Sequence, residues 1–226
     1  MPQIMFRGLY LSHRKRWVWR WVWTIMLVAM VSLICVVFMY QQTQAQMRYG
    51  MDTPLQDRYS EYKTREDIYK ILRDNKMNLA QGMEIAEAII VQSKRTEIPV
   101  KMFLALMRTE SNFTVRAVSN NRAMGIMQIH PITWRKYTKK LNLSSSREEA
   151  FRPSVNIMVS ASILKDLHDK YQRMGYQEPQ LWDHVLSAYY AGEGSVRSGL
   201  NRHDLRYVHK VRTYVNEYGQ RLSMVL

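Results

Sequence analysis

The sequence predicts a mainly α-helical protein in which one membrane-spanning helix precedes a single compact helical domain. Three observations favour this class. Residues 21–40 form an uninterrupted apolar run, apolar residues recur at helical spacing from about residue 83 onward, and no segment shows the sustained alternation of a hairpin strand. A length of 226 residues suits one compact domain with appendages.

The apolar run (WVWTIMLVAMVSLICVVFMY) contains no charge, Pro or Gly, and about 20 helical residues span the hydrocarbon core of a bilayer. Cations precede the run, while residues 41–46 after it carry no charge, so the amino terminus is expected in the cytoplasm and the rest outside. Aromatic residues gather at both ends, as they do at membrane–water interfaces. The cations are Arg7, Arg14, Lys15, Arg16 and Arg20; the aromatic residues are Trp17, Trp19, Trp21 and Trp23 at one end and Phe38 and Tyr40 at the other.

Two alternatives compete with a retained anchor. One is a signal peptide cut after residues 43–45 (TQA), although the run is longer than the usual 7–15 apolar residues of such peptides. A buried helix of a soluble protein is disfavoured, because the charge-free run follows a basic cluster. We therefore expect a cytoplasmic tip and anchor over residues 1–40.

Residues 41–79 are polar and poor in aliphatic side chains, and we interpret them as a tether that becomes a charged helix around residues 61–75. The apolar stripe of that helix is thin (Tyr62, Ile68, Ile71, Leu72), so a free stalk and packing on the following domain are both open. The domain itself is expected over residues 80–226.

Within that domain the periodicity predicts successive helices. The first carries Met83, Ile85, Ala86, Ile89 and Ile90 and ends before residues 96–99, where Pro99 suits the start of the next. The later helices are expected at 99–111, at 126–141, from Pro153 through a core stripe that ends at Leu167, at 181–191 and at 205–222.

The composition limits the classes of partner and cofactor that this protein can bind. A formal net charge of +14 indicates an anionic partner, and nucleic acid, anionic lipid and a carboxylate-rich cell wall all fit. Export and the lack of a basic-aromatic motif argue against nucleic acid. The single Cys35 excludes an intramolecular disulfide, and no two histidines have the i, i+4 spacing of a zinc helix, so no metal or cofactor is expected.

The helix after Pro99 places a carboxylate on an apolar face. Val100, Phe103, Leu104 and Met107 form its stripe, and Glu110 continues the same spacing. Burial there disfavours the charged form and raises the pKa of the carboxyl, which keeps an acid protonated near neutral pH. On periodicity alone, a solvated acid at a helix end is the favoured interpretation.

The residues that follow change that balance, because they resemble the soluble lytic transglycosylase (SLT) family, whose domain is related to goose-type lysozyme. The family pattern is E-S-x-F/W, A-x-S, G-A-x-G-L-M-Q-I-x-P, N-I and A-Y-N-A-G, in this order. The matching segments are 110–113 (ESNF), 117–119 (AVS), 123–131 (AMGIMQIHP), 156–157 (NI) and 188–192 (AYYAG), within a region of similarity over about 83–215.

The resemblance implies a lysozyme-like fold with Glu110 as the catalytic acid. It implies that Ser119 and Gln128 position the saccharide in the cleft, that Tyr189 faces the acid, and that Tyr214 is the tyrosine found late in the domain. Other interpretations remain open: Ser119 as a turn residue, Gln128 as a buried amide in need of partners, and Tyr189 as a core aromatic residue.

Three residues depart from the family pattern. Tyr190 stands in place of Asn, Glu193 in place of Pro, and Ser160 in place of Gly. Tyr190 is expected nearest the cleft, where it would contact substrate and alter affinity or register.

The family's reaction needs one carboxylate and no cofactor. It implies that Glu110 protonates the β-1,4 bond between N-acetylmuramic acid (MurNAc) and N-acetylglucosamine (GlcNAc) in peptidoglycan, and then deprotonates the muramyl C6 hydroxyl, which closes a 1,6-anhydro end. The expected location is the bacterial inner membrane, spanned by residues 21–40, with the domain in the periplasm. Analogy alone suggests service to a secretion, conjugation or phage-entry system. A lysozyme-like hydrolase and an inactive wall-binding component are the alternatives.

Overall fold

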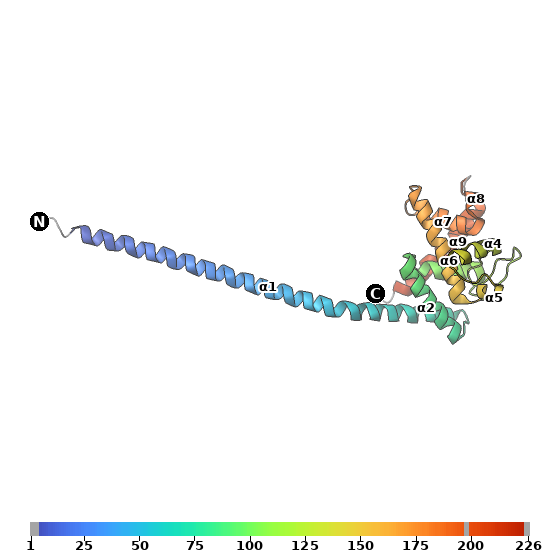
Figure 1. The fold of residues 1–226 in the computed structure, drawn as a ribbon, viewed down its shortest axis with the longest axis horizontal. Helices are drawn as coiled ribbons and strands as arrows, with labels where there is room; N and C mark the ends of the chain where they lie inside the picture. Colours follow the sequence, from blue (N-terminus) through green and yellow to red (C-terminus); the bar gives the residue numbers. More distant parts are fainter. Residues whose placement is uncertain (1–4, 197–198, 224–226) are drawn as a thin grey trace. The chain divides into compact units, whose positions relative to one another are not determined.

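The computed structural model describes the backbone of residues 5–196 and 199–223 and the side chains of residues 21–43, 55–196 and 199–222. The chain divides into two compact units, residues 1–58 and 59–226, and each is described by itself. Helices account for all the regular secondary structure of the described backbone apart from two isolated β-bridges, so the mainly α prediction is confirmed (Figure 1).

The first unit contains most of helix α1 (Met5–Asp74). The segment Trp21–Thr43 of this helix is long and apolar enough to cross a membrane, with a mean hydropathy of 2.7, and its side chains are exposed. A retained anchor and a signal sequence both meet this requirement. The side chains of the expected basic flank (Arg7, Arg14, Lys15, Arg16, Arg20), of Trp17 and Trp19, and of residues 44–45 lie outside the described residues.

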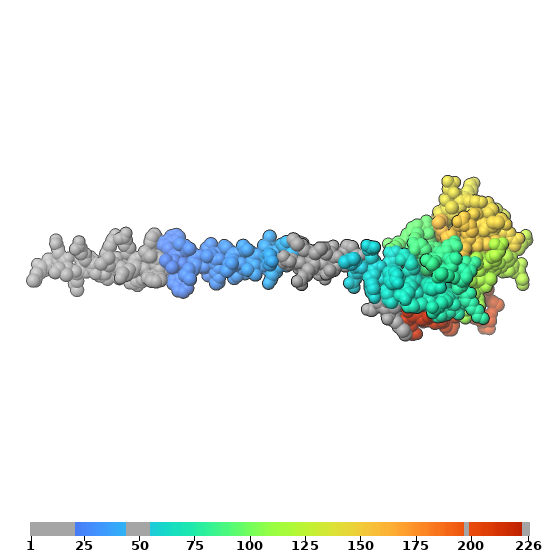
Figure 2. Space-filling model, turned by 90° about the horizontal axis from the view of Figure 1, so that it is seen from below, coloured from blue at the N-terminus to red at the C-terminus, as the bar shows by residue number. Residues whose placement is uncertain are grey.

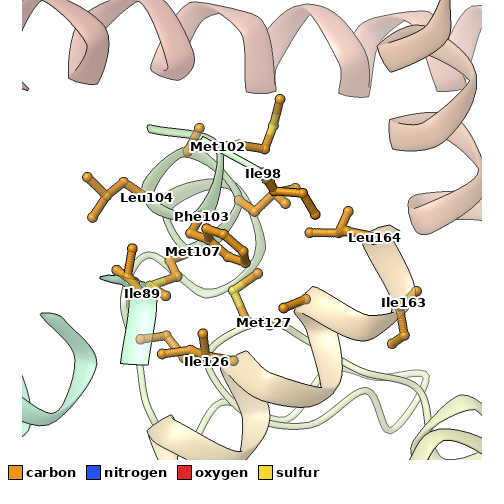
Figure 3. Close-up of a cluster of buried hydrophobic side chains, with 14 of the residues drawn as sticks. Ile89, Ile98, Met102, Phe103, Leu104, Met107, Ile126, Met127, Ile163 and Leu164 are labelled. Atoms are coloured by element: carbon orange, nitrogen blue, oxygen red, sulfur yellow. The ribbon is translucent and has the colours of Figure 1, made fainter. Parts of the chain in front are cut away.

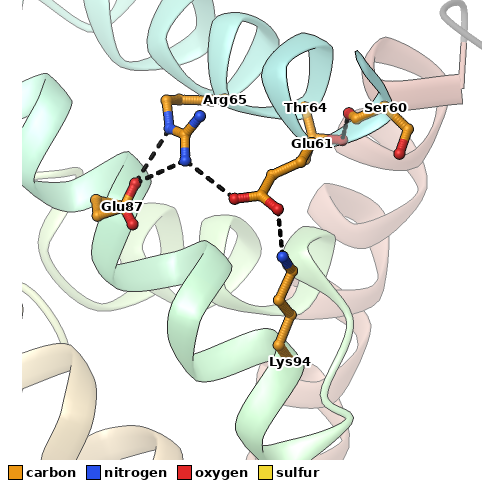
Figure 4. Close-up of polar contacts among 6 residues, drawn as sticks. All are labelled: Ser60, Glu61, Thr64, Arg65, Glu87 and Lys94. Atoms are coloured by element: carbon orange, nitrogen blue, oxygen red, sulfur yellow. Dashed lines mark hydrogen bonds and ion pairs between the residues drawn. The ribbon is translucent and has the colours of Figure 1, made fainter. Parts of the chain in front are cut away.

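The end of α1 belongs to the second unit and packs on helix α2 (Leu79–Thr96). Ile68, Ile71 and Leu72 are buried there, so of the two alternatives for this segment the structure has the packed one. Arg65 donates to Glu87 of α2 at 2.9 Å, and Lys94 pairs with Glu61 (Figure 4). Figure 2 shows the two helices side by side, in cyan and green, on one face of this unit.

The buried aliphatic side chains, not the ion pairs, hold this contact together. Each fully buried Ile or Leu contributes about 1.5–3 kcal/mol, whereas an exposed ion pair contributes about 0–1 kcal/mol. The hydrogen bond from Lys94 is the main reason why the pKa of Glu61 lies below its ordinary value.

Helix α3 (Val100–Ser111) lies at the centre of the second unit. Pro99 is its N-cap, and α2 ends at Thr96, so the predicted break between the two helices is confirmed. Leu104, Phe103 and Met107 are fully buried. Figure 3 shows side chains of this helix meeting residues of α2, of the loop after α3 and of α6, including Ile89, Ile126, Met127 and Leu164.

The helix expected at 126–141 begins later than predicted: α4 spans Pro131–Lys140. Residues 126–130 belong instead to a loop in which Met124 and Ile129 form a two-way backbone bridge, with both N···O distances 3.0 Å. Gln128 has a φ of +49°, which no α-helix accommodates. Since Pro131 lacks an N–H, it suits the first helical position, and the helix starts there.

The remaining helices agree with the predicted order. They are α6 (Pro153–Arg173), α7 (Gln180–Ala191) and α9 (Arg202–Ser223), with the short α5 (Arg147–Ala150) and α8 (Glu193–Val196) between them. Helix α3 packs mainly on α9, and α7 lies against both α6 and α9. The last turn of α3 is therefore bordered by α9.

Candidate active site

Glu110 lies in the last turn of α3 and is half-buried, so it is not the solvated acid that periodicity alone favoured. Burial raises the pKa of this carboxyl to about 7, against the opposing effects of a hydrogen bond from Tyr207 and the charge of Lys210. An acid with this pKa is about half protonated at neutral pH, which suits proton donation followed by proton acceptance.

Tyr207 of α9 donates its hydroxyl hydrogen to Oε1 of Glu110. Its side chain is buried, and burial beside the carboxyl raises its own pKa well above the ordinary value, so it stays a neutral donor. Sequence reasoning missed this residue. The apolar spacing of α9 puts Tyr207 and Tyr214 on the same buried face, and it does not tell which of them is level with Glu110.

Tyr214, the residue predicted from the family pattern, lies two helical turns beyond Tyr207. Its ring stacks with that of Tyr218 at a centroid distance of 6.3 Å, and the guanidinium of Arg108 lies 5.7 Å from the Tyr214 ring centroid. The tyrosine that the structure brings to the acid is thus Tyr207, and a substrate contact by Tyr214 stays a prediction.

Tyr190 covers Tyr207. The two rings are nearly parallel, with an interplanar angle of 16° and centroids 4.4 Å apart. Tyr190 comes from the last turn of α7 and is 52% exposed, so its outer surface faces solvent. The residue that departs from the family pattern is therefore in direct contact with the partner of the acid.

Burial raises the pKa of Tyr189 above its ordinary value, and the negative charge of Glu110 nearby raises it further. Its hydroxyl donates to the carbonyl oxygen of Met127 at 2.8 Å and lies 2.9 Å from Oγ of Ser160. Because a phenol has one proton, Ser160 must be the donor in the second bond. The buried Ser160 thus orders the hydroxyl of Tyr189 toward the loop.

Asn156 of α6 holds the loop after α3 in place, and its side chain is fully buried. Its Oδ1 accepts from the N–H of Met127 at 2.9 Å, and its Nδ2 donates to the carbonyl oxygens of Met124 (3.2 Å) and Ala150 (2.9 Å). Gly125 has a φ of +80°, and a Cβ there would lie 2.3 Å from the Ala150 oxygen. Only glycine fits at this position.

Gln128 is half-buried in the same loop. Its Nε2 donates to the carbonyl oxygens of Ala117 (3.1 Å) and Gly125 (2.9 Å), which assigns the nitrogen and leaves Oε1 on the other side of the amide. The amide nitrogen thus holds the loop, as the buried-amide interpretation predicted, and a contact between the amide oxygen and a saccharide stays a prediction.

Ser119 closes a turn in the loop. Its Oγ accepts from the N–H of Ala123 at 3.0 Å, and its backbone N–H donates to the Ala123 carbonyl oxygen at 3.0 Å. The turn interpretation is thus correct, and the hydroxyl hydrogen remains a donor for a substrate. A contact with saccharide stays a prediction.

Three further acids of this unit form ion pairs with neighbouring cations. Asp166 binds Lys140 at 2.6 Å, Asp169 binds Lys165 at 2.8 Å, and Glu149 binds Arg152 at 3.1 Å. Glu193 pairs with Lys170 at the edge of a charged cavity of about 300 Å³ between α4 and α6, which none of the predicted site residues lines.

Among the described residues, no three His, Cys, Asp or Glu side chains gather as metal ligands would. Cys35 lies exposed in α1. The direct contact that the structure shows at the acid is the hydrogen bond between Tyr207 and Glu110.

The helical unit that carries Glu110 at the end of its central helix has a lysozyme-like fold. Two solved structures share it at a TM-score of 0.53: the lytic transglycosylase Slt of Pseudomonas aeruginosa, 20% identical over 69% of this chain and 30% of its own, and a 70-kDa soluble lytic transglycosylase in complex with bulgecin A, 21% identical over 68% and 29%. The Transglycosylase SLT domain family matches residues 87–206, more than half of the chain, and the chain belongs to this family.

Curated relatives point the same way. Membrane-bound lytic murein transglycosylase C of Histophilus somni (strain 2336) is 33% identical over 105 residues, which make up 45% of this chain and 29% of the relative. The enzyme of the same name from Mannheimia succiniciproducens is 35% identical over 108 residues, 46% of this chain and 30% of the relative. The chain thus spans less than a third of the length of these relatives.

Proposed function

We propose that this chain is a membrane-anchored lytic transglycosylase that cleaves the MurNAc–GlcNAc β-1,4 bond of peptidoglycan. The observation that carries the proposal is the environment of Glu110, a half-buried carboxyl with a pKa of about 7 that accepts a hydrogen bond from a buried tyrosine. Membership of the SLT family and the similarity to murein transglycosylases support the substrate class.

In the first step, Glu110 gives its proton to the glycosidic oxygen as the bond to the muramyl C1 breaks, and the GlcNAc 4-hydroxyl leaves. In the second, the Glu110 carboxylate takes the proton of the muramyl C6 hydroxyl, whose oxygen closes on C1 to form the 1,6-anhydro end. The proton returns to Glu110 and no water is consumed. Tyr207 stabilises the carboxylate between the two steps, because a hydrogen bond to a charged acceptor is stronger than one to a neutral acceptor.

The other predicted site residues serve binding and orientation in this proposal. Oε1 of Gln128 and the hydroxyl of Ser119 offer one acceptor and one donor to the glycan, and the exposed ring of Tyr190 offers an apolar face to a sugar ring. Tyr189 holds the loop that carries Gln128, through Met127. Correct orientation of bound reactants contributes substantially to rate without any further charged group.

The test is digestion of purified sacculi by the full chain in a non-ionic detergent, with mass spectrometry of the products. The matched control is Glu110→Gln, which keeps the shape of the side chain and removes the proton. We expect anhydro-muropeptides from the wild type and a loss of about 10²- to 10⁴-fold or more in the variant, the size of a general acid–base contribution.

Three other outcomes would overturn the proposal. Reducing ends instead of anhydro ends would mean a hydrolase on the same fold. Cosedimentation of both proteins with sacculi, without any cleavage, would mean a wall-binding component. Equal rates for the wild type and Glu110→Gln would exclude Glu110 as the acid.

We also propose that the segment Trp21–Thr43 anchors the chain in the inner membrane, with the second unit in the periplasm, where it opens the wall locally for an envelope-spanning system. The exposed apolar side chains of this segment and the membrane-bound character in the names of the relatives support the anchor. Extraction of the chain from membranes by detergent but not by high salt is expected, and release by salt alone would contradict it.

A further inference from the structure

The contact between Tyr190 and Tyr207 carries an inference about how the acid is controlled. Tyr207 is the hydrogen-bond donor to Glu110, and its ring lies flat against Tyr190 with centroids 4.4 Å apart. The two residues come from different helices, α9 and α7, which pack against each other. Within the described residues, the side chain that donates a hydrogen bond to Glu110 is that of Tyr207, and Tyr190 contacts Tyr207.

The direction of the Tyr207 hydroxyl depends on the plane and position of its ring. A phenol turned about its side-chain torsions moves its oxygen by several ångströms, so a bond to one carboxylate oxygen requires a fixed ring. Stacked aromatic pairs restrict this motion and contribute to stability beyond the area that they bury. The Asn of the family pattern has no ring to offer at this position.

We propose that Tyr190 is a positioning residue for the acid: by stacking on Tyr207 it keeps the Tyr207 hydroxyl on Glu110 and thereby sets the protonation of Glu110. The inference rests on the proposed role of Glu110 and goes beyond the saccharide contact suggested for Tyr190. It gives this departure from the family pattern a role that acts through Tyr207, separate from any contact of its exposed face with substrate.

The sign of the effect follows from the groups around Glu110. The bond from Tyr207 and the charge of Lys210 lower the pKa of Glu110, while burial raises it. If Tyr190 acts through the Tyr207 hydroxyl, removal of its ring weakens the bond and the pKa of Glu110 rises. If Tyr190 only excludes water, its removal hydrates the carboxyl and the pKa falls. The two roles therefore predict opposite shifts.

The experiment is a carboxyl ¹³C NMR titration of the full chain in non-ionic detergent, labelled at glutamate Cδ. The Glu110 signal is identified by its loss in Glu110→Gln. Tyr190→Leu should raise the pKa of Glu110 by roughly 0.5 to 1, the size expected from an aromatic stacking energy. Tyr190→Phe keeps the stacked ring and should leave the titration unchanged, which makes it the matched control.

The same substitution in a Tyr207→Phe variant distinguishes an effect through the Tyr207 hydroxyl from an effect through water exclusion. In Tyr207→Phe the hydroxyl is already absent, so adding Tyr190→Leu should produce no further shift. A shift that persists in that background, or a downward shift in the single variant, would assign the ring to water exclusion and overturn the inference. No shift in Tyr190→Leu would overturn it too and leave only a saccharide contact, visible as a higher KM at unchanged kcat.

The titration does not depend on turnover. If the wild type produced no anhydro-muropeptides, the proposed function would fail while the coupling of Tyr190 to Glu110 was still measured. If turnover were normal and Tyr190→Leu left the Glu110 titration unchanged, the present inference alone would fail.

Discussion

Two tyrosines lie beside Glu110, and the difference between them explains the organisation of the site. Both are at least partly buried, and burial raises the pKa of both, yet their hydroxyls go to different acceptors. Tyr207 donates to the acid, whereas Tyr189 donates to the carbonyl oxygen of Met127. The hydroxyl that comes from α9 thus contacts the acid and lowers its pKa, and the hydroxyl that comes from α7 holds the loop after α3.

The residues that depart from the family pattern follow the same division. Tyr190 stacks on Tyr207, and Ser160 donates to Tyr189. Glu193, the third departure, pairs with Lys170 and ties α8 to α6. Each departure therefore makes a specific contact in this chain, and two of the three act on the tyrosines next to Glu110.

The largest change in stability is expected from the bonds that hold the loop after α3. Asn156→Ala leaves one buried N–H and two buried carbonyl oxygens without their partners, and each such group costs about 1–3 kcal/mol. We expect a loss of about 3 kcal/mol or more in the free energy of unfolding of the second unit, measured by urea denaturation. Asn120→Ala, an exposed asparagine in the same loop, is the control and should change little. Similar losses in both variants would mean that Asn156 does not hold the loop.

More of the fold than of the site could be predicted from the sequence, for a physical reason. Helix order and the break near Pro99 follow from local periodicity, which short stretches of sequence carry, whereas the burial of Glu110 was expected only once the family resemblance was added. The start of α4 was predicted too early, because the conformation of residues 124–129 depends on bonds to Asn156, about 30 positions away along the chain. A helical pattern in the loop sequence does not report such distant partners.

The sequence did not identify Tyr207 as the tyrosine that contacts Glu110, for a related reason. Tyr207 and Tyr214 are seven residues apart, close to two full turns, so they share one face of α9. Only the packing of α9 on α3 decides that Tyr207 lies level with Glu110 while Tyr214 lies near Arg108. The sequence indicated that both tyrosines lie on the buried face of α9. It did not indicate which of them packs against the last turn of α3.

Removing each hydroxyl in turn sharpens the comparison between the tyrosines. Tyr207→Phe removes a bond that lowers the pKa of Glu110, so this pKa should rise from about 7 by roughly 1, given the strength of hydrogen bonds to charged acceptors. An acid that must start protonated loses activity as the pH rises through its pKa, so the alkaline limb of kcat/KM should move to higher pH.

Tyr189→Phe is the matched control, since it deletes the same atom from the other tyrosine. It should leave the alkaline limb in place and lower the free energy of unfolding by about 1 kcal/mol, because the Met127 oxygen loses a donor. Equal displacement of the limb by both variants would show that the two hydroxyls are not divided as the contacts indicate.

The smallest effect concerns Lys210, which lies on the same side of the site as Tyr207 and lowers the pKa of Glu110 by its charge. Lys210 is exposed, so solvent and salt screen this charge, and Lys210→Gln should raise the pKa of Glu110 by only a few tenths at low salt. In the wild type the same rise should appear when salt is added, because screening and removal of the charge are equivalent. In Lys210→Gln the salt dependence should vanish, while Lys139→Gln, an exposed lysine of α4, should keep it. A persistent salt dependence in Lys210→Gln would mean that the field at Glu110 comes from the whole basic surface, and the division between the two sides of the site would then hold for hydrogen bonds but not for charge.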